Sequence, residues 1–325
     1  MAYYTGNAAN VAAVLTALTN ACEDEGWTWS GGILSKADPG IFVRLDAATE
    51  IYSHTALCMW GRTAIDSGET PKFVSMSVPV QNIFPTYPVT YHVFVFTSEV
   101  FMVINYVDKF QWLAFGQSNQ PGLGSSGNWV AATCGYAEYV HPTILKTWST
   151  GTYGSEINLN GGDLGDGYYD YQRKIVPAMF WADLNNEEID NRANNTGANW
   201  YLDAGLEAGT YTPWMQPRDA ASQKYLIELL TTQPNNFNNE GVLIPIKVFQ
   251  KRSSSKFSQV LQVQNARHIR VDNYTPTEVI ALGTDQWMVF PWYLKNSVSR
   301  SSCSGLDTPP HSGTFGWAIK YEPPA

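Results

Sequence analysis

Three short apolar runs in the first half of the chain, separated by brief polar breaks, constrain its fold more than any other feature. They span Val89 to Phe96, Val100 to Tyr106 and Lys109 to Gly116, and they are rich in the β-branched and aromatic residues that favour strands. The first break, Thr97-Ser98-Glu99, has a length suited to a hairpin loop. The sequence therefore predicts a β-meander of three consecutive antiparallel strands.

Similar runs, bounded by Gly, Pro or polar clusters, predict further strands on both sides of this meander. They are Ile41 to Leu45, Phe73 to Val78, Val242 to Phe249, Gln259 to Gln264, His268 to Val271, Glu278 to Leu282 and Trp287 to Pro291.

One helix is predicted near the N-terminus, from Asn7 to Glu25. Its apolar residues recur at the spacing of a single helical face, and Gly26 is expected to end it. A second, short helix is predicted from Ala220 to Leu230. The expected fold class is α+β, predominantly antiparallel β, with an N-terminal amphipathic helix and a few short helices.

A glycine-rich stretch divides the chain. Six glycines lie between Thr150 and Gly167 with almost no large aliphatic residue, which is typical of a loop or domain junction. We expect a helix-plus-β domain over residues 1–149, a junction over 150–170, and a second β-rich domain with short helices over 171–325. A chain of 325 residues is long enough for this division.

Composition narrows the classes of partner. Charged residues make up only 15% of the chain and the net charge is −9, which argues against wrapping DNA as the main task. The most apolar segment, Val89 to Val107, is interrupted by polar residues, so no membrane insertion is expected. The N-terminus has no Lys or Arg before its apolar stretch, unlike a secretory signal, and we expect synthesis in a cytoplasm.

Motifs for enzyme chemistry are weak. Asp163, Asp166 and Asp170 lie in a glycine-rich stretch, but the pattern of a calcium loop is missing. The four cysteines are widely separated, which disfavours a zinc site. Carboxylates and tryptophans are plentiful, but no spacing selects a glycosidase pair. We find no nucleophile motif and no phosphate-binding glycine loop. The sequence thus predicts no catalytic residue, no cofactor and no metal.

The aromatic residues, 14% of the chain, are the most general clue to function. Tyr, Trp and Phe are enriched at the buried anchors of protein interfaces, although sugar-binding surfaces use them too. Positions inside predicted strands favour core and interface roles over sugar stacking. The candidate interface residues are Trp112, Phe115, Trp129, Trp287, Phe290 and Trp292.

A basic segment between Gly241 and Val271 contains no acid. Its six basic residues are Lys247, Lys251, Arg252, Lys256, Arg267 and Arg270. One interpretation is a solvated hairpin with the serine-rich tip Ser253-Ser254-Ser255. A second is a docking arm that contacts an acidic face of a neighbouring subunit. A third is non-specific proximity to DNA, without sequence reading.

Three ordered stretches resemble a family of tailed-bacteriophage virion structural proteins. The first comprises Met1 to Gly6, the predicted helix that follows, and Gly32 to Lys36. The second is Asn105 to Gly116, followed by Gly127-Asn128-Trp129. The third joins Trp287 to Pro291 with Ser312 to Tyr321. The resemblance spans nearly the whole chain, and the family shows a similar strand ending in an aromatic-x-x-Phe-Gly pattern.

This resemblance implies a non-enzymatic virion component, a self-associating ring or connector subunit of the tail assembly at its neck end or baseplate. The implied partners are copies of the chain in a symmetric ring and other tail or neck proteins. The implied location is the virion, assembled in the host bacterial cytoplasm. The alternative is a receptor- or carbohydrate-binding tail component, whose exposed Trp and Tyr rings would stack on host glycan.

Overall fold

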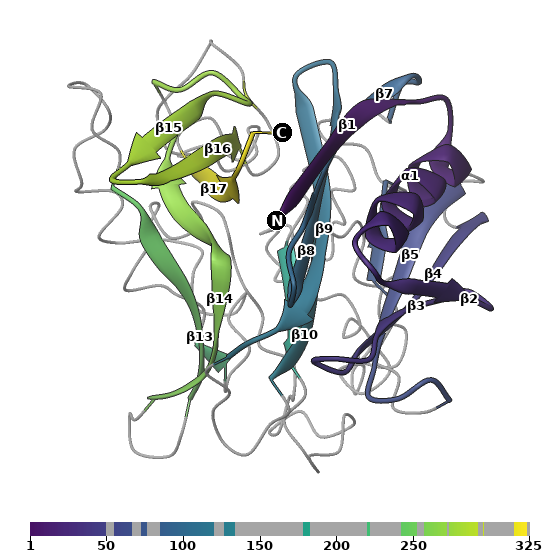
Figure 1. Ribbon diagram of the computed structural model, residues 1–325. Helices are drawn as coiled ribbons and strands as arrows, with labels where there is room; N and C mark the ends of the chain where they lie inside the picture. Colours follow the sequence, from purple (N-terminus) through teal and green to yellow (C-terminus); the bar gives the residue numbers. More distant parts are fainter. Residues whose placement is uncertain are drawn as a thin grey trace, which may run out of the picture.

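In the computed structural model, the described residues form three antiparallel β-sheets stacked side by side and one helix (Figure 1). The structure describes residues 1–49, 55–66, 73–76, 85–119, 127–133, 178–182, 220–221, 242–251, 257–271, 273–291, 295 and 315–323. Predominantly antiparallel β structure, as predicted from the sequence, is confirmed.

The central sheet contains the predicted meander. Its strands, in spatial order, are β1 (Ala2–Ala8), β7 (Val89–Val95), β8 (Glu99–Tyr106), β9 (Lys109–Gln117), β10 (Asn128–Thr133) and β11 (Ala178–Ala182). Nearly every residue of β8 and β9 is buried, on both faces of the sheet. This double burial explains why these strands are almost continuously apolar rather than alternating.

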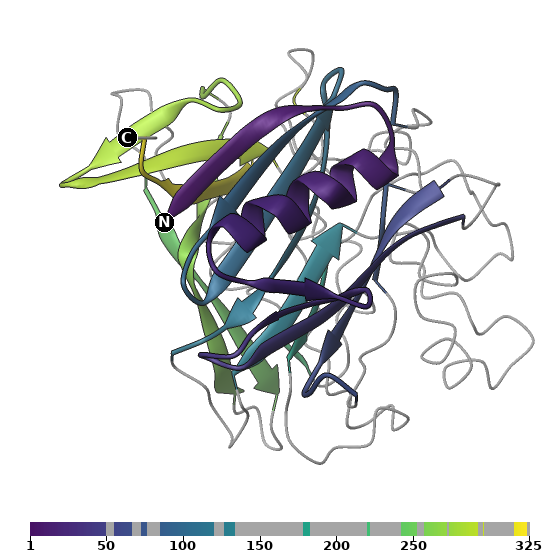
Figure 2. The same ribbon diagram turned by 45° about the vertical axis from the view of Figure 1, so that its right-hand side comes forward.

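The N-terminal sheet lies on one side of the central sheet. Its strands run in sequence order: β2 (Thr28–Ser30), β3 (Ile33–Lys36), β4 (Ile41–Thr49), β5 (Thr55–Arg62) and β6 (Phe73–Ser75). Helix α1 (Val11–Asp24) packs between this sheet and strands β1 and β7, as Figures 1 and 2 show. Its Val14, Leu18 and Cys22 side chains are fully buried in the core that these elements share.

The helix begins later than its apolar spacing predicts. Asn10 is the N-cap residue, and its side-chain Oδ1 accepts a 2.8 Å hydrogen bond from the Ala13 backbone N–H. The prediction of helix from Asn7 is wrong, because residues 2–8 pair with β7 along their whole length as β1. Tertiary pairing with a strand more than 80 residues away decides this boundary.

The C-terminal sheet lies on the other side of the central sheet. Its spatial order is β12 (Ala220–Ala221), β13 (Ile244–Lys251), β14 (Phe257–Arg270), β17 (Phe315–Tyr321), β16 (Asp285–Pro291) and β15 (Val279–Leu282). Two strands predicted within residues 259–271 form a single strand, β14.

The expectation of several short helices is only partly met. Within the described residues α1 is the only helix. The predicted helix at Ala220 to Leu230 is wrong at its start, because Ala220 and Ala221 pair with β13 as a strand; residues 222–230 lie outside the described residues. The glycine-rich stretch 150–170 also lies outside them, and the two-domain division stays a prediction. Strand β11, which follows that stretch, pairs with β10.

Candidate functional site

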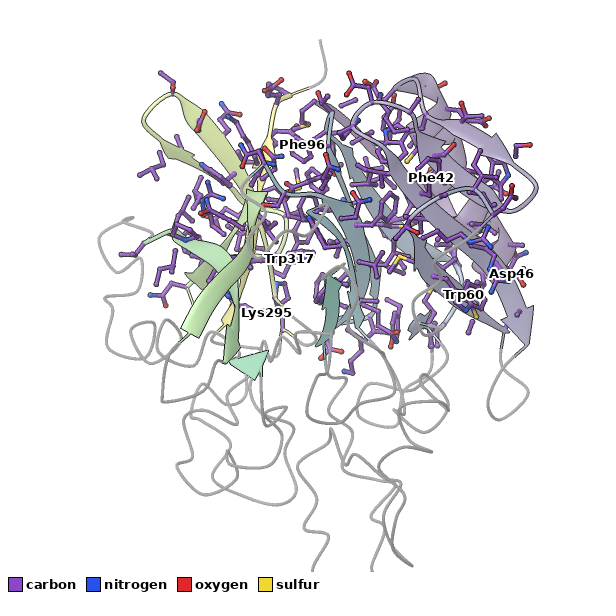
Figure 3. The ribbon with its side chains drawn as sticks, turned by 90° about the horizontal axis from the view of Figure 1, so that it is seen from below. Phe42, Asp46, Trp60, Phe96, Lys295 and Trp317 are labelled. Atoms are coloured by element: carbon purple, nitrogen blue, oxygen red, sulfur yellow. The ribbon has the colours of Figure 1, made fainter. Side chains whose placement is uncertain are left out.

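The central and C-terminal sheets meet through a layer of aromatic rings, which we call the sheet interface. The Trp112 and Trp317 ring centroids are 4.7 Å apart, and the ring of Phe101 meets Trp317 edge-on at 5.6 Å. Nearby, Phe94 of β7 meets Phe290 of β16 edge-on at 5.9 Å. Figure 3 shows Trp317 at this boundary, between the two sheets. These geometries are the favourable ones for aromatic pairs, so the layer holds two parts of the same chain together.

The structure places the predicted interface aromatics inside the chain. Relative exposure is 0% for Trp112, Phe115 and Phe290, 2% for Trp129 and 5% for Trp287; Trp292 lies outside the described residues. A side chain buried this deeply has no surface left for another subunit. These five rings therefore pack in the core of one chain, and any contact with another subunit must use other residues.

A carboxylate lies at one end of the sheet interface. Glu99, the first residue of β8, is fully buried, and its side chain crosses to β14. Oε1 accepts a 2.8 Å hydrogen bond from the Gln264 backbone N–H. Oε2 accepts one of 2.8 Å from the Asn265 backbone N–H and one of 2.9 Å from the Asn265 side-chain amide. Burial raises the pKa of Glu99 to about 7, against the opposing effect of these bonds and of the positive Arg267.

An irregularity in β14 explains why these N–H groups are available. Gln262 pairs with Lys247 of β13 and Arg267 pairs with Pro245, so four residues of β14 lie opposite Ile246 alone. A bulge of this kind leaves backbone groups without ladder partners. Glu99 accepts hydrogen bonds from two of the N–H groups that the bulge releases.

Arg267 stabilises the carbonyl side of the same bulge. Its Nη1 donates to the carbonyl oxygens of Gln264 at 2.6 Å and Ala266 at 2.8 Å. The guanidinium also lies over the Trp287 ring, 5.0 Å from its centroid. Burial lowers the pKa of Arg267, although Glu99 acts in the opposite direction. Arg267, predicted as part of a basic docking arm, is thus held by its own chain.

The other predicted arm residues lie along the β13–β14 pair or beyond it. Lys247 and Lys251 belong to β13, opposite Gln262 and Phe257 of β14. Arg270 is paired with Phe315 of β17. Arg252 and Lys256 lie outside the described residues, as does the serine-rich tip. The pairing of the two flanking strands confirms the hairpin, and the arm's contact with a neighbour or DNA stays a prediction.

Additional polar contacts join the central and C-terminal sheets. Ser118 Oγ donates to the Gln262 carbonyl oxygen at 2.9 Å and accepts from the Gln262 N–H at 3.1 Å. The Lys295 backbone N–H donates to the Asp108 carbonyl oxygen at 3.0 Å, and its Nζ donates to the Val271 carbonyl oxygen. Lys295 therefore ties the turn between β8 and β9 to the end of β14.

Two histidines of this region are buried and neutral at pH 7. Burial lowers the pKa of His92 to about 4 and that of His268 to about 3. A 2.7 Å hydrogen bond joins His92 Nδ1 to the Tyr3 hydroxyl, and the His92 ring packs against Phe290 at 5.2 Å. His268 lies opposite Trp317 in the β14–β17 pair. Both imidazoles pack between strands of the same chain.

The N-terminal sheet carries a different aromatic feature on its outer face. The Arg44 guanidinium lies 3.6 Å from the centroid of the Trp60 ring, and both side chains are partly exposed. Figure 3 shows Trp60 and Asp46 on this sheet, on the opposite side of the molecule from Trp317. Because the Trp60 ring is partly exposed, an external ligand could reach it.

The described residues contain no cluster of three or more His, Cys, Asp or Glu side chains able to hold a metal ion. Asp163, Asp166 and Asp170 lie outside those residues. Cys22 and Cys58 are fully buried, and burial raises the pKa of Cys22. In the described part of the chain, no helix is long and apolar enough to cross a membrane.

Sequence reasoning missed Glu99, which it assigned to a hairpin loop. The residue is in phase with Phe101 and Val103 on the strand face that meets the C-terminal sheet, and this alternation was the available clue. Gly116 lies directly opposite Glu99 and ends the aromatic-x-x-Phe-Gly pattern of the sequence. A Cβ there would lie 2.5 Å from the Ser98 carbonyl oxygen and 2.8 Å from Glu99 Cγ, so glycine makes room for the carboxylate.

Comparison with known proteins adds no name to this geometry. No family model matches the chain, and no curated protein sequence matches it.

Proposed function

We propose that the chain is a non-enzymatic virion structural protein of a tailed bacteriophage. In this proposal it is a self-associating ring or connector subunit of the tail assembly, at the neck end or baseplate. Its partners are further copies of the chain and other tail or neck proteins.

The observation that carries the proposal is the exposed edge of the C-terminal sheet. Strand β15 has the sequence Val279-Ile280-Ala281-Leu282, without a charged residue, and Val279 and Leu282 are 40% and 53% exposed. An uncharged, exposed edge strand is a template for pairing with another chain. A protein that works by assembly has a use for such an edge, whereas a protein that acts alone benefits from blocking it.

The interior supports a structural role as well. The buried titratable groups Glu99, His92 and His268 all lie where strands of the same chain pack together. A fully buried carboxylate whose two oxygens accept three hydrogen bonds from one strand is arranged to join sheets, not to reach a substrate. The aromatic layer between the sheets serves the same purpose, and it makes the three layers suitable as a rigid building block.

Mass spectrometry of purified, sequence-verified virions tests the proposal. We expect the chain among the structural proteins of the particle, and antibody labelling on virions is expected to place it on the tail. If intact particles lack the polypeptide, the proposal fails.

A second candidate function, receptor or carbohydrate binding by a tail component, is favoured by the partly exposed Trp60 on the N-terminal sheet. Tryptophan beside Arg44 and the exposed Asp46 combines a stacking surface with polar groups that could orient a sugar. A glycan array tests this function directly. Binding that disappears in Trp60→Ala but persists in Trp29→Ala would support it, and an array without any binder would remove it.

A further inference from the structure

Strand β15 is the last strand of the C-terminal sheet, and it pairs with β16 alone among the described residues. It is joined to β16 by the two residues Gly283 and Thr284, and Gly283 has the positive φ of 62° that such a tight hairpin requires. Within the part of the chain that the structure describes, the opposite long side of β15 is therefore an unpaired sheet edge, and Val279 and Leu282 on it are exposed.

The register of the hairpin shows which backbone groups face outward. The Val289 N–H donates to the Glu278 carbonyl oxygen at 2.9 Å, and the Val289 carbonyl oxygen accepts from the Thr277 N–H at 2.8 Å. Because hydrogen-bonding direction alternates along a strand, Ile280 and Leu282 also point their backbone groups at β16. The N–H and C=O groups of Val279 and Ala281 therefore point away from the sheet.

The charged side chains that flank β15 have partners within the chain. Glu278 Oε2 accepts a 2.8 Å hydrogen bond from the Thr275 backbone N–H. Asp285 forms a 3.0 Å ion pair with Lys320 of β17. Edge strands are commonly protected from pairing by charged side chains on the edge, and β15 itself carries none.

We propose that two copies of this chain pair through β15, antiparallel, about a two-fold axis at Ile280. The inference rests on the proposed function, which requires contact between copies, and it assigns that contact to one strand. In this register Val279 lies opposite Ala281 of the second copy, and the reciprocal pair follows by symmetry. Both pairs use the outward-facing groups and exchange four backbone hydrogen bonds between them.

In this register the two Glu278 side chains do not lie opposite each other. Glu278 of one copy lies opposite Leu282 of the other, and the two Glu278 carboxylates stand at opposite ends of the pairing. The contact is isologous, so it joins copies in twos, and a larger ring needs a second, different interface. The paired C-terminal sheets would form one continuous sheet across the two copies.

A cysteine at the two-fold axis tests the register. In Ile280→Cys the two new thiols lie in a pair without mutual hydrogen bonds, where Cα atoms are about 4.5 Å apart, within the range of a disulfide. Mild oxidation of the full chain is expected to give a covalent dimer. In the control, Thr284→Cys, the exposed turn residues of two paired copies are about 20 Å apart along the strands. That variant is expected to crosslink no more than wild type.

A proline substitution tests the hydrogen bonds. Ala281→Pro removes an outward N–H that β16 does not use, so the fold should tolerate it. Each copy loses one hydrogen bond, so the dimer loses two. We expect the dissociation constant of the dimer, measured by analytical ultracentrifugation, to rise about tenfold or more. Ala281→Val keeps the N–H and is expected to dimerise like wild type. Unfolding temperatures of both variants show whether the sheet is intact.

Several results would overturn the pairing. They are a wild-type chain that stays monomeric at all concentrations, equal crosslinking of Ile280→Cys and Thr284→Cys, or unchanged dimerisation of a folded Ala281→Pro variant. Should the proline variant fail to fold, the crosslinking comparison decides alone. A chain found in virions whose Ile280→Cys variant does not crosslink keeps the proposed function and loses this interface.

Discussion

The carboxylate of Glu99 and the backbone and side-chain amides of Asn265 are joined by two hydrogen bonds of 2.8 and 2.9 Å across 166 residues of sequence. This contact links the start of β8 to the bulge of β14 and so connects the central sheet to the C-terminal sheet. It places an ionisable group in a fully buried site, where burial raises its pKa against the opposing effect of its hydrogen-bond partners.

Replacing Glu99 tests this link. Glu99→Gln puts an amide nitrogen against a backbone N–H, so one donor loses its acceptor. We expect the free energy of unfolding to fall by about 1–3 kcal/mol, the usual cost of a buried group left unsatisfied. Urea unfolding provides the measurement, with the exposed helix residue variant Glu23→Gln as the control. Equal effects of the two substitutions would show that Glu99 does not join the sheets.

The raised pKa of Glu99, about 7, predicts a pH dependence. Between its ordinary value of 4.5 and 7, the folded chain holds a proton that the unfolded chain has released. The contribution of Glu99 to stability therefore decreases as the pH rises through this window. The difference in unfolding free energy between wild type and Glu99→Gln should shrink from pH 4.5 to pH 7. A difference that grows with pH would mean that the folded carboxyl has a lowered pKa.

The buried histidines predict that the stability of the fold decreases as the pH falls, the opposite of the effect of Glu99. Their folded pKa values of about 4 and 3 lie below the ordinary 6.5, so the unfolded chain binds protons that the folded chain does not. Their stabilising effect is complete above pH 6.5 and is lost as the pH falls toward those values. Urea unfolding of His268→Leu between pH 4 and 7 should give a flatter acid limb than wild type. An unchanged limb would contradict the burial of a neutral imidazole.

Two glycines are predicted to resist even the smallest substitution. A Cβ on Gly316 would lie 2.1 Å from the Phe290 carbonyl oxygen, a rigid backbone atom of the adjacent strand. Gly316→Ala should therefore destabilise the fold by about 3 kcal/mol or more, and Gly116→Ala, beside Glu99, by about as much. Gly6→Ala is the control, because its Cβ would meet only the end of the Tyr91 side chain, which can move. Thermal unfolding of the three variants ranks their stabilities.

Trp317 is expected to be the most costly aromatic residue to truncate. Its ring is fully buried and contacts both Trp112 and Phe101 of the central sheet. Trp317→Ala should lower the free energy of unfolding by about 3–5 kcal/mol. Val107→Ala, at a position that is 73% exposed, should change it by about 0.5 kcal/mol or less. Similar losses for both variants would place Trp317 outside the stabilising core.

The elements that the sequence predicts well are those whose pattern is local. The meander from Val89 to Gly116 is confirmed strand by strand, because its runs are long, apolar and separated by short loops. Strand β1 was missed because its residues, Ala2 to Ala8, are half polar and become a strand only beside β7. The apparent break between two strands at residues 265–267 overlaps the bulge of β14 at residues 263–266, where backbone N–H groups bond to Glu99 rather than to β13.

The candidate site shows the same division. Aromatic residues at strand positions predict burial, and Trp112, Phe115 and Phe290 are indeed buried. Whether a buried ring meets its own chain or a neighbour depends on which sheets stack, and no local pattern carries that information. Arg267 is a similar case: its charge predicts an exposed arm, but the bulge offers carbonyl oxygens that hold the guanidinium within the fold.

By itself, the sequence determined that this chain forms antiparallel strands around an apolar core, because residue type and period act over a few neighbouring positions. The stacking of the sheets, the partners of Glu99 and the free edge at β15 were decided by tertiary structure alone. The reason is that these features arise from contacts between segments far apart in the sequence, such as Phe101 with Trp317 and Glu99 with Asn265, whose energies depend on burial and register that no single segment contains.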